Sequence, residues 1–325
     1  MKEEKKTKIK IMDTLRRFPG GIFVIPLLLS AFINTLFPQA FLIGGMVSPL
    51  FKNGSMMIIG FILFCCGTTI SYKEFIRMLK QNSAYVIIKL MIIAITGLLV
   101  HWVIPPKGIF GIPGVALFAV FSSTNPALYL EQVKRYGTDV DEAAFPLINV
   151  ITTTAVPMFI YEITGLADSS FSGIRFLSLI CPFIIGFIIG NLDSSVGDFF
   201  KNGIGMMIPV LAINIGANIN LLETVHSGAA GLILSVLYLI INIGIFLLFD
   251  KIILKRPGYL GVSWCSVAGV STAVVNLIVD SDPSLEPYRA ISISMIAIAT
   301  IVTNILMPII NKKFVSIWGC GLDNT

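Results

Sequence analysis

The hydrophobic positions of this chain gather into long stretches, and short segments between them hold most of the charged residues. Each stretch is roughly 17 to 22 residues long, the length that a helix needs to cross a bilayer core of about 30 Å. We identify ten stretches, at 18–37, 54–70, 83–104, 114–130, 143–164, 174–191, 203–219, 228–249, 259–279 and 289–310. The pattern predicts an all-α integral membrane protein with ten transmembrane helices.

The overall composition agrees with this class. Of the 325 residues, 55% are hydrophobic and 13% are charged, and the mean hydropathy is +0.89, whereas a soluble globular chain carries about a quarter charged residues. Residues 1–17 look like the charged start of a signal peptide, but the apolar run that follows lacks a small-residue cleavage site. We therefore expect a cytoplasmic tail at 1–17 and a retained first span.

The distribution of basic residues predicts the orientation. If the stretches cross alternately, most of the 23 Lys and Arg residues fall on the side of the N-terminus. The opposite loops hold Lys52, Lys107, Arg175 and Arg289. Because loops rich in Lys and Arg stay in the cytoplasm, we expect both termini there. The net charge of +5 then follows from topology, and we expect no nucleic-acid partner.

A weak internal repeat relates the two halves of the chain. Some residues recur 149 positions later and others 144 positions later, because the loops of the second half are shorter. The first set pairs Asn53-Gly54 with Asn202-Gly203 and Gly67 with Gly216, and the second pairs Pro113-Gly114 with Pro257-Gly258 and Ser122 with Ser266. We predict two five-helix repeats, 18–166 and 167–313, with a cytoplasmic tail at 314–325. Since five is odd, the second repeat is inverted, as in many secondary transporters.

The fourth and ninth stretches are each interrupted by polar residues. The first break is SSTNP, from Ser122 to Pro126, and the second is SVAGVST, from Ser266 to Thr272. A broken helix at membrane depth must be enclosed by protein or line a cavity. In an inverted repeat, the second halves of both helices point their N-terminal ends toward a common centre. Those ends carry partial positive charge and free N–H groups, so they favour an anion, while the carbonyl ends suit a cation.

Polar residues in and near the breaks are the candidate substrate-binding residues. These side chains are suited to bind an organic anion that carries hydroxyl groups. The alternative for each hydroxyl is a bond back to its own helix or to a neighbouring span. For Gly269 the alternative is close packing. The candidates are Ser122, Ser123, Thr124, Asn125, Ser266, Gly269, Ser271 and Thr272 from the breaks, with Lys89, Asn149, Thr152 and Thr153 from neighbouring spans.

Lys89 is the basic residue that the pattern places inside a span. A charge at that depth is a functional candidate by default, so Lys89 is expected to bind the substrate carboxylate or to pair with another charge. The alternative is that its long side chain extends to the membrane interface. The sequence leaves both interpretations open.

The sequence shows little sign of a metal-binding or catalytic motif. The five cysteines show no paired metal spacing, and both histidines fall near the ends of spans, so no metal site and no cofactor are expected. The Gly186–Gly190 pattern fits a close helix contact. The chain has no HExxH, GxSxG or phosphate-loop motif. We therefore expect no enzyme, and a membrane-embedded enzyme is only a distant alternative.

Several short motifs carry a family resemblance. They are Phe18-Pro19-Gly20-Gly21, Thr124-Asn125, Leu128-Tyr129, Tyr136-Gly137-Thr138, Gly190-Asn191-Leu192-Asp193 and Phe199-Phe200. With them the chain resembles the bacterial 2-keto-3-deoxygluconate permeases over nearly its whole length, to about Lys313. The resemblance implies a multi-pass protein of the bacterial cytoplasmic (inner) membrane that takes up a hydroxylated sugar-acid anion with protons.

The resemblance also implies a fold similar to that of bile acid:sodium symporters, in which two crossing broken helices belong to a core that moves against a panel. Here the core would comprise 83–166 and 226–313, and the panel 18–70 and 172–219. The chain departs from the family pattern at three places. Ser122 and Ile151 stand where the resemblance implies acidic residues, and Pro126-Ala127 stands where it implies two glycines.

The sequence thus favours a symporter that takes up 2-keto-3-deoxygluconate or a related sugar acid by alternating access, coupled to protons. A sodium-coupled transporter of another organic anion is the alternative, because the missing acids leave the coupling ion open. The expected partners are a small organic anion and the lipid bilayer. The sequence does not indicate the oligomeric state.

Overall fold

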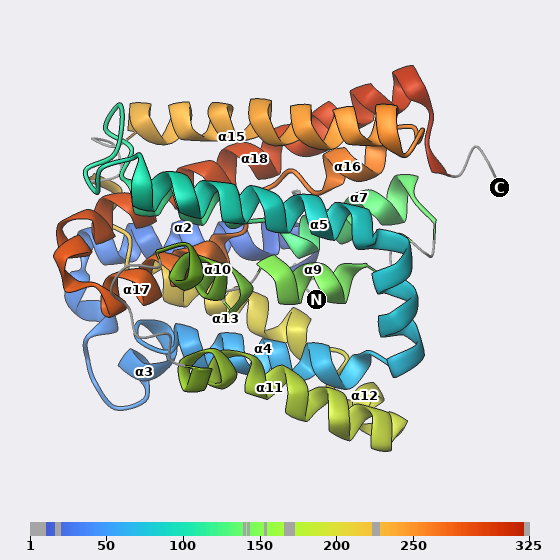
Figure 1. Ribbon diagram of the computed structural model, residues 1–325. Coiled ribbons are helices and arrows are strands. Elements are labelled where there is room, and N and C mark those ends of the chain that lie inside the picture. Colours follow the sequence, from blue (N-terminus) through green and yellow to red (C-terminus); the bar gives the residue numbers. More distant parts are fainter. Residues whose placement is uncertain are drawn as a thin grey trace, which may run out of the picture.

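The computed structural model describes residues 11–16, 21–138, 141, 144–152, 155–165, 173–222 and 228–321. These residues form helices and connecting loops, and the strand-like feature among them is one isolated bridge between Ile109 and Ile112. The described part of the chain is thus all-helical, as the hydrophobic pattern predicts (Figure 1).

The first half contains α1 (Ile11–Arg16), α2 (Gly21–Leu36), η1 (Pro38–Phe41), α3 (Val47–Phe51), α4 (Ser55–Thr69), α5 (Tyr72–Trp102), α6 (Gly114–Ser122), α7 (Pro126–Tyr136), α9 (Phe145–Thr152) and α10 (Ala155–Gly165). The second half contains α11 (Gly173–Leu192), α12 (Ser194–Phe200), α13 (Gly203–Gly216), α15 (Gly228–Leu248), η2 (Phe249–Ile253), α16 (Tyr259–Ser263), η3 (Gly269–Ser271), α17 (Thr272–Ser281), η4 (Pro283–Tyr288) and α18 (Arg289–Trp318).

Four helical segments of the described chain are long and apolar enough to cross a membrane. They are Asn82–Trp102, Ser194–Gly216, Gly228–Ile253 and Pro283–Trp318. Shorter apolar helices lie at Gly21–Leu36, Ser55–Thr69, Ile180–Leu192 and Gly269–Ser281. The class of an all-α membrane protein is therefore confirmed, and the inverted repeat of ten spans stays a prediction.

Two helix boundaries differ from the sequence-based expectation. Helix α5 begins at Tyr72 and not near residue 83, because its first turns are polar and a hydropathy pattern does not detect them. The second break begins at Trp264, since α16 ends at Ser263, and the chain is helical again from Gly269. Ser271 and Thr272 therefore lie in helical turns and not in the break itself, although their hydroxyl groups made them look like part of it.

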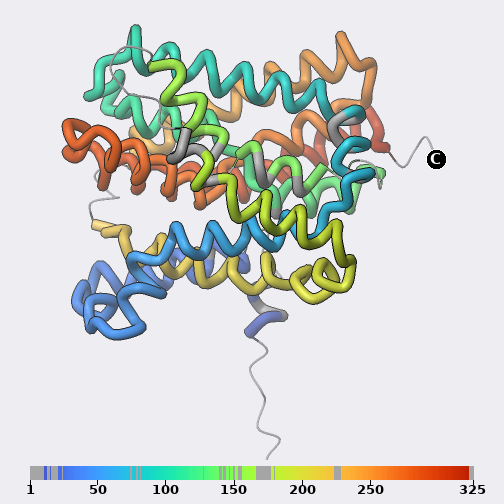
Figure 2. Tube along the Cα trace, turned by 60° about the horizontal axis from the view of Figure 1, so that its bottom comes forward, coloured from blue at the N-terminus to red at the C-terminus, as the bar shows by residue number. Residues whose placement is uncertain are grey.

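The helices pack in two groups. In one, α4 packs against α11 and α13, and α2 packs against α13; in the other, α5 packs against α6 and α10, and α18 packs against α15 and α17. Figure 2 shows α4 and α11 running side by side, apart from the segments coloured orange and red. Helix α9 packs against α5, and η3 packs against α17 and α18, so both belong to the second group. Contacts of α9 with α4 and of η3 with α13 join the two groups.

Glycines allow the closest approach within the first group. A Cβ atom added at Gly186 would collide with the backbone oxygen of Phe64, and one added at Gly190 would collide with that of Thr68. Both oxygens belong to α4. The close-packing interpretation of the Gly186–Gly190 pattern is therefore confirmed, and the contact is backbone against backbone, as in small-residue interfaces of membrane helices.

Gly186→Leu is expected to destabilise the protein strongly, because the new side chain must force α11 away from the α4 backbone. Overpacking of a tight interface costs about 1–3 kcal/mol. The measurement is the melting temperature of the purified protein in detergent. Gly244→Leu is the matched control, since a Cβ atom at Gly244 meets no atom within 4 Å. An equal melting temperature for Gly186→Leu and the control would contradict this packing.

Candidate functional site

The first break lies at Ser123, Thr124 and Asn125, where the sequence predicts it. Ser123 has extended backbone angles, φ −79° and ψ 148°. Pro126 begins α7, and a proline disfavours the helical conformation of the residue before it. The Asn125 Oδ1 atom accepts a hydrogen bond of 3.3 Å from the Leu128 N–H and so caps α7. Local sequence thus favours a break at this position.

The second break comprises residues 264–268, which connect α16 to η3. Ala268 is extended, with φ −89° and ψ 137°, and the Ser271 N–H donates to its carbonyl oxygen at 3.1 Å. Gly258 precedes α16 with φ 102°, a left-handed conformation that favours glycine. The Pro257-Gly258 pair therefore fixes where the first half of this helix begins.

The two breaks are hydrogen-bonded directly to each other. The Asn125 N–H donates to Ser266 Oγ at 3.2 Å, and the Ala268 N–H donates to Ser123 Oγ at 2.7 Å. The Thr124 hydroxyl donates to the Trp264 carbonyl oxygen at 2.9 Å. The hydroxyl oxygens of Ser271 and Ser123 lie 2.6 Å apart. The segments predicted to meet do meet, and these side chains satisfy backbone groups that the breaks leave without helical partners.

Lys89 of α5 points at the first break. Its Nζ atom donates to the carbonyl oxygen of Phe121 at 3.0 Å and to that of Ser123, and its side chain is 0% exposed. The alternative in which Lys89 extends to the membrane interface is therefore wrong. The carbonyl end of α6 attracts the ammonium group more strongly than the interface does, because these carbonyls lack intrahelical partners.

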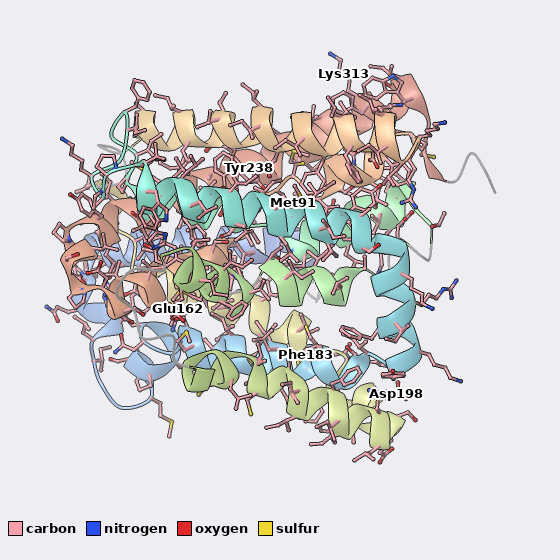
Figure 3. The ribbon with its side chains drawn as sticks, in the orientation of Figure 1. Met91, Glu162, Phe183, Asp198, Tyr238 and Lys313 are labelled. Atoms are coloured by element: carbon pink, nitrogen blue, oxygen red, sulfur yellow. The ribbon has the colours of Figure 1, made fainter. Side chains whose placement is uncertain are left out.

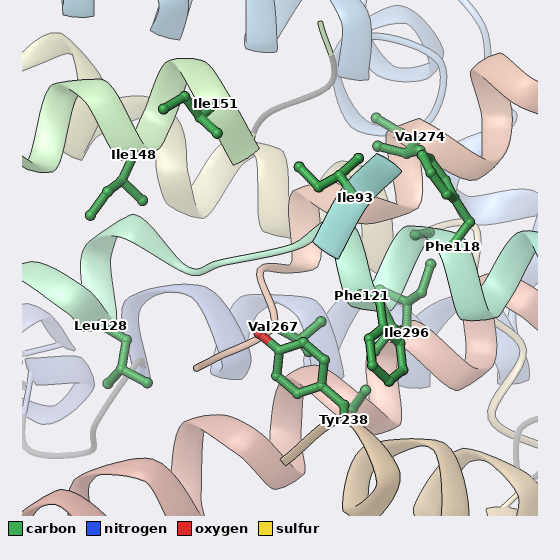
Figure 4. Packing of buried hydrophobic residues seen from close by; sticks show 14 of the residues in the cluster. Ile93, Phe118, Phe121, Leu128, Ile148, Ile151, Tyr238, Val267, Val274 and Ile296 are labelled. Atoms are coloured by element: carbon green, nitrogen blue, oxygen red, sulfur yellow. The ribbon is translucent and has the colours of Figure 1, made fainter. Parts of the chain in front are cut away.

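Tyr238 of α15 links both breaks and is absent from the sequence-based candidates. Its hydroxyl oxygen lies 3.0 Å from the carbonyl oxygens of Ser123 and Ser266, and its ring lies 5.8 Å from Lys89 Nζ. Figure 4 shows Tyr238 beside Phe121 and Val267, where the extended segments run, and Figure 3 places it inside the helix packing. One signal could have revealed it: Tyr238 follows Lys89 by 149 positions, the separation seen in the internal repeat.

Helices α9 and α18 each contribute a threonine to one break. Thr152 Oγ1 of α9 lies 3.0 Å from the Thr124 carbonyl oxygen, and Thr303 Oγ1 of α18 accepts from the Val267 N–H at 3.0 Å. Thr152 is thus brought to the site as predicted. The side chain of Asn149 and the whole of Thr153 lie outside the described residues, so their predicted roles stay predictions.

Among the described residues, four buried polar atoms of α18 have no hydrogen-bond partner, and two of them, on Thr300 and Asn304, lie near the breaks. Asn304 accepts a bond of 3.2 Å from Asn125 Nδ2, but its own Nδ2 atom is unpaired and buried. Thr300 Oγ1, one turn earlier, is likewise buried and unpaired. A buried polar group without a partner costs about 1–3 kcal/mol, so these two atoms are suited to receive polar groups of a ligand. Thr300 is absent from the sequence-based candidates.

Three predicted residues have local roles in this conformation. Ser122 Oγ lies 3.1 Å from the Ala119 carbonyl oxygen, and Thr272 Oγ1 lies 2.8 Å from that of Gly269, so both hydroxyls bond back to their own helices. Gly269 is a close-packing residue: a Cβ atom there would collide with the Phe23 ring of α2. The contact brings the first helix group onto the second break.

The site carries positive and neutral groups, and its described part contains no carboxylate. The buried acids of the described chain lie elsewhere. Asp250 accepts from the Tyr85 hydroxyl and from the Gly261 N–H at 2.8 Å, and Asp141 accepts from the Tyr259 hydroxyl at 2.8 Å. The described His, Cys, Asp and Glu residues form no group of three that could hold a metal ion. An ammonium group beside helix ends therefore favours an anionic ligand.

Comparisons with known proteins agree with the resemblance in the sequence motifs. A model of the 2-keto-3-deoxygluconate permease family matches residues 12–318. The 2-keto-3-deoxygluconate permease 1 of Salmonella typhimurium is 34% identical over 304 residues, which cover 94% of this chain and 95% of that protein. The 2-keto-3-deoxygluconate permeases of Enterobacter sp. and Bacillus subtilis are each 31% identical, over 96% and 93% of this chain and 95% and 92% of those proteins.

Proposed function

Since the chain belongs to the 2-keto-3-deoxygluconate permease family, we propose that it is a symporter that takes up 2-keto-3-deoxygluconate or a related sugar-acid anion. Family membership makes it a multi-pass membrane transporter and not an enzyme. The proposed location is the bacterial cytoplasmic membrane, with both termini in the cytoplasm.

One observation carries the proposal: two buried helix breaks bond to each other beside a lysine whose described partners include no carboxylate. The N-terminal ends of α7 and α17 supply partial positive charge for the ligand carboxylate, and Lys89 supplies a full one. Ser123, Thr124, Asn125, Ser266 and Ser271 exchange their present mutual bonds for bonds to ligand hydroxyls. This exchange costs little because one set of hydrogen bonds replaces another.

The proposed mechanism is alternating access around the breaks. It is supported by the related positions of Lys89 and Tyr238, which lie 149 residues apart and both reach the carbonyl oxygen of Ser123. Thr152 and Thr303, from α9 and α18, likewise each bond to the break of their own half. These pairs support an inverted repeat of ten spans. The separate packing of α2, α4, α11 and α13 supports a panel against which the other helices move.

Uptake into proteoliposomes tests the function. The purified protein is expected to accumulate labelled 2-keto-3-deoxygluconate when a proton gradient, inward and acid outside, is imposed. Empty liposomes and collapse of the gradient by a protonophore are the controls. Absence of uptake under both a proton and a sodium gradient would contradict the proposal.

The alternative is a sodium-coupled transporter of another organic anion. This alternative stays open because positions 122 and 151 hold Ser122 and Ile151 and not acidic residues, and proton coupling needs a side chain that can bind and release a proton. Sodium chloride would then raise the melting temperature of the wild-type protein, while potassium chloride would not. Uptake driven by a proton gradient in sodium-free buffer argues for the proton.

A further inference from the structure

We propose that Lys89 carries the coupling proton, and that its ammonium group occupies the position at the carboxyl end of α6 where a metal cation would otherwise bind. The inference rests on the proposed symport of a sugar-acid anion and names the group responsible for its coupling. No acidic residue of the described site can take this role.

The geometry of the first break is that of a cation site already filled by the protein. Helix α6 ends at Ser122, and the carbonyl oxygens of Phe121 and Ser123 both accept from Lys89 Nζ. The carboxyl end of a helix carries about half a negative charge. In transporters with broken helices, such carbonyls coordinate the coupling sodium ion or proton. The ammonium group therefore stands where a sodium ion would have its ligands.

Within the described part of the chain, Lys89 has no opposite full charge beside it. Among the described residues, no carboxylate forms an ion pair with its Nζ atom, and the side chain is 0% exposed. A buried ion without a counter-ion costs several kcal/mol, and two carbonyl dipoles compensate only part of that. The cost falls in two ways: an anion arrives beside the ammonium group, or the proton leaves. Occupancy by an anion and protonation of Lys89 are thus linked.

The described groups around Lys89 supply no opposite full charge to it. Tyr238 faces it from α15, and Cys265 faces it from the second break. Helices α6 and α9 have no titratable side chain in their sequences. Helix α10 carries Tyr161 and Glu162, which lie at the other end of α5, where the Tyr161 ring centroid is 4.3 Å from that of His101. Tyr85, one turn earlier on α5, donates to Asp250, and Arg256 Nη1 lies 3.4 Å from its hydroxyl oxygen. None of these described groups is a free carboxylate that could compensate the Lys89 charge, because Asp250 is already bonded to Tyr85 and Gly261.

The linkage gives a symport cycle in which charges balance. The outward-facing protein holds the ammonium form of Lys89 and the substrate carboxylate together, and this neutral pair crosses. After the anion leaves on the cytoplasmic side, the ammonium group releases one proton and becomes an amine. The empty protein returns with a neutral Lys89 and takes up one proton outside. If the proton crossed alone, the ammonium group would be buried without a partner, and if the anion crossed alone, its carboxylate would be buried beside a neutral amine. Both states carry an uncompensated charge, so the proton and the anion cross together.

Proton exchange on ligand binding tests this assignment. In weakly buffered detergent solution with a pH indicator, the wild-type protein is expected to take up protons when 2-keto-3-deoxygluconate binds at alkaline pH. Lys89→Gln and Lys89→Arg should bind it more weakly and with no proton uptake, because neither side chain titrates in this range. In proteoliposomes both should lose accumulation driven by a proton gradient, while retaining slower exchange of labelled for unlabelled ligand.

Lys52→Gln is the matched control. Lys52 Nζ also donates to neutral oxygens, Asn34 Oδ1 at 3.2 Å and Ala217 O at 3.3 Å, but it is remote from the breaks. This variant should keep the proton uptake and the accumulation of the wild type. Proton uptake on binding by Lys89→Gln, or binding by the wild type without proton exchange, would overturn the assignment.

A second measurement needs no sugar acid, so it separates failure of this inference from failure of the proposed function. Lys89→Ala empties the carbonyl site, and sodium chloride should then raise its melting temperature by about 2–4 °C over choline chloride at equal ionic strength. The wild-type protein should show no such difference. Sodium stabilisation of the wild type, or none in Lys89→Ala, would overturn the cation-site assignment. A wild-type protein that binds no sugar acid but passes this test would refute only the proposed ligand.

Discussion

Asn125→Ala is expected to lower the uptake of 2-keto-3-deoxygluconate by on the order of 100-fold, because one buried amide serves three purposes. Its Nδ2 atom donates to Asn304 Oδ1 at 3.2 Å, and its Oδ1 atom caps α7 through the Leu128 N–H at 3.3 Å. In the proposed site it also faces the ligand. Alanine leaves the Asn304 amide without this donor and removes the cap. The measurement is initial uptake into proteoliposomes.

Two further variants separate these purposes. Asn125→Asp keeps an acceptor for the Leu128 N–H but loses the donor to Asn304 and places a negative charge beside an anion, so it should also be inactive. Asn53→Ala removes an exposed asparagine from the loop before α4 and should transport normally. Loss of the α7 cap costs only about 1 kcal/mol, so Asn125→Ala should still fold. Wild-type uptake by Asn125→Ala would contradict a binding centre at the breaks.

Gly269→Val is expected to lower uptake at least tenfold, since the new side chain requires the space that the Phe23 ring occupies. Phe23 lies on α2 and Gly269 begins η3, so their contact joins the two groups of helices at the second break. Overpacking here costs about 1–3 kcal/mol, which corresponds to roughly 5- to 150-fold in a conformational equilibrium. Valine is preferred to alanine because a phenyl ring can rotate away from a single methyl group.

Phe23→Ala in the same protein should restore most of the uptake, because it vacates the space that valine needs. The four proteins of this double-mutant cycle are compared by initial uptake rate, and the coupling is expected to be positive and large. Gly228→Val is the matched control, since a Cβ atom at Gly228 meets no atom within 4 Å. If Phe23→Ala brings no recovery, the ring is not what valine displaces.

The local backbone features of the site could be predicted from the sequence, but the contacts that other helices make with it could not. Ser-Thr-Asn-Pro specifies the first break through the restriction before Pro126 and the capping amide of Asn125. The second break lacks such strong signals, and its predicted position was two residues late at the start because Trp264 and Cys265 are as apolar as the helix before them. Local chemistry is readable in sequence where proline and asparagine fix the backbone.

Tyr238 and Thr300 show why contacts across helices were missed. Each stands in an apolar helix with no motif around it, and each becomes relevant only because α15 and α18 pack against the breaks. In a soluble helix, a polar face reveals which side is buried. In a membrane helix, the lipid-facing side is as apolar as the buried side, so hydropathy cannot distinguish them. Met91 and Lys89 illustrate the point: they are two residues apart on α5, and Met91 is exposed while Lys89 is fully buried.

The sequence by itself determined that this protein is an all-α membrane protein of the permease class, and it located the paired breaks, because helix length in lipid and backbone restriction by proline are local properties. Only the tertiary structure decided that Lys89 turns to the carbonyl end of α6, that Tyr238 joins both breaks and that Phe23 covers Gly269. These contacts depend on which faces of the helices meet, and helix packing alone sets that.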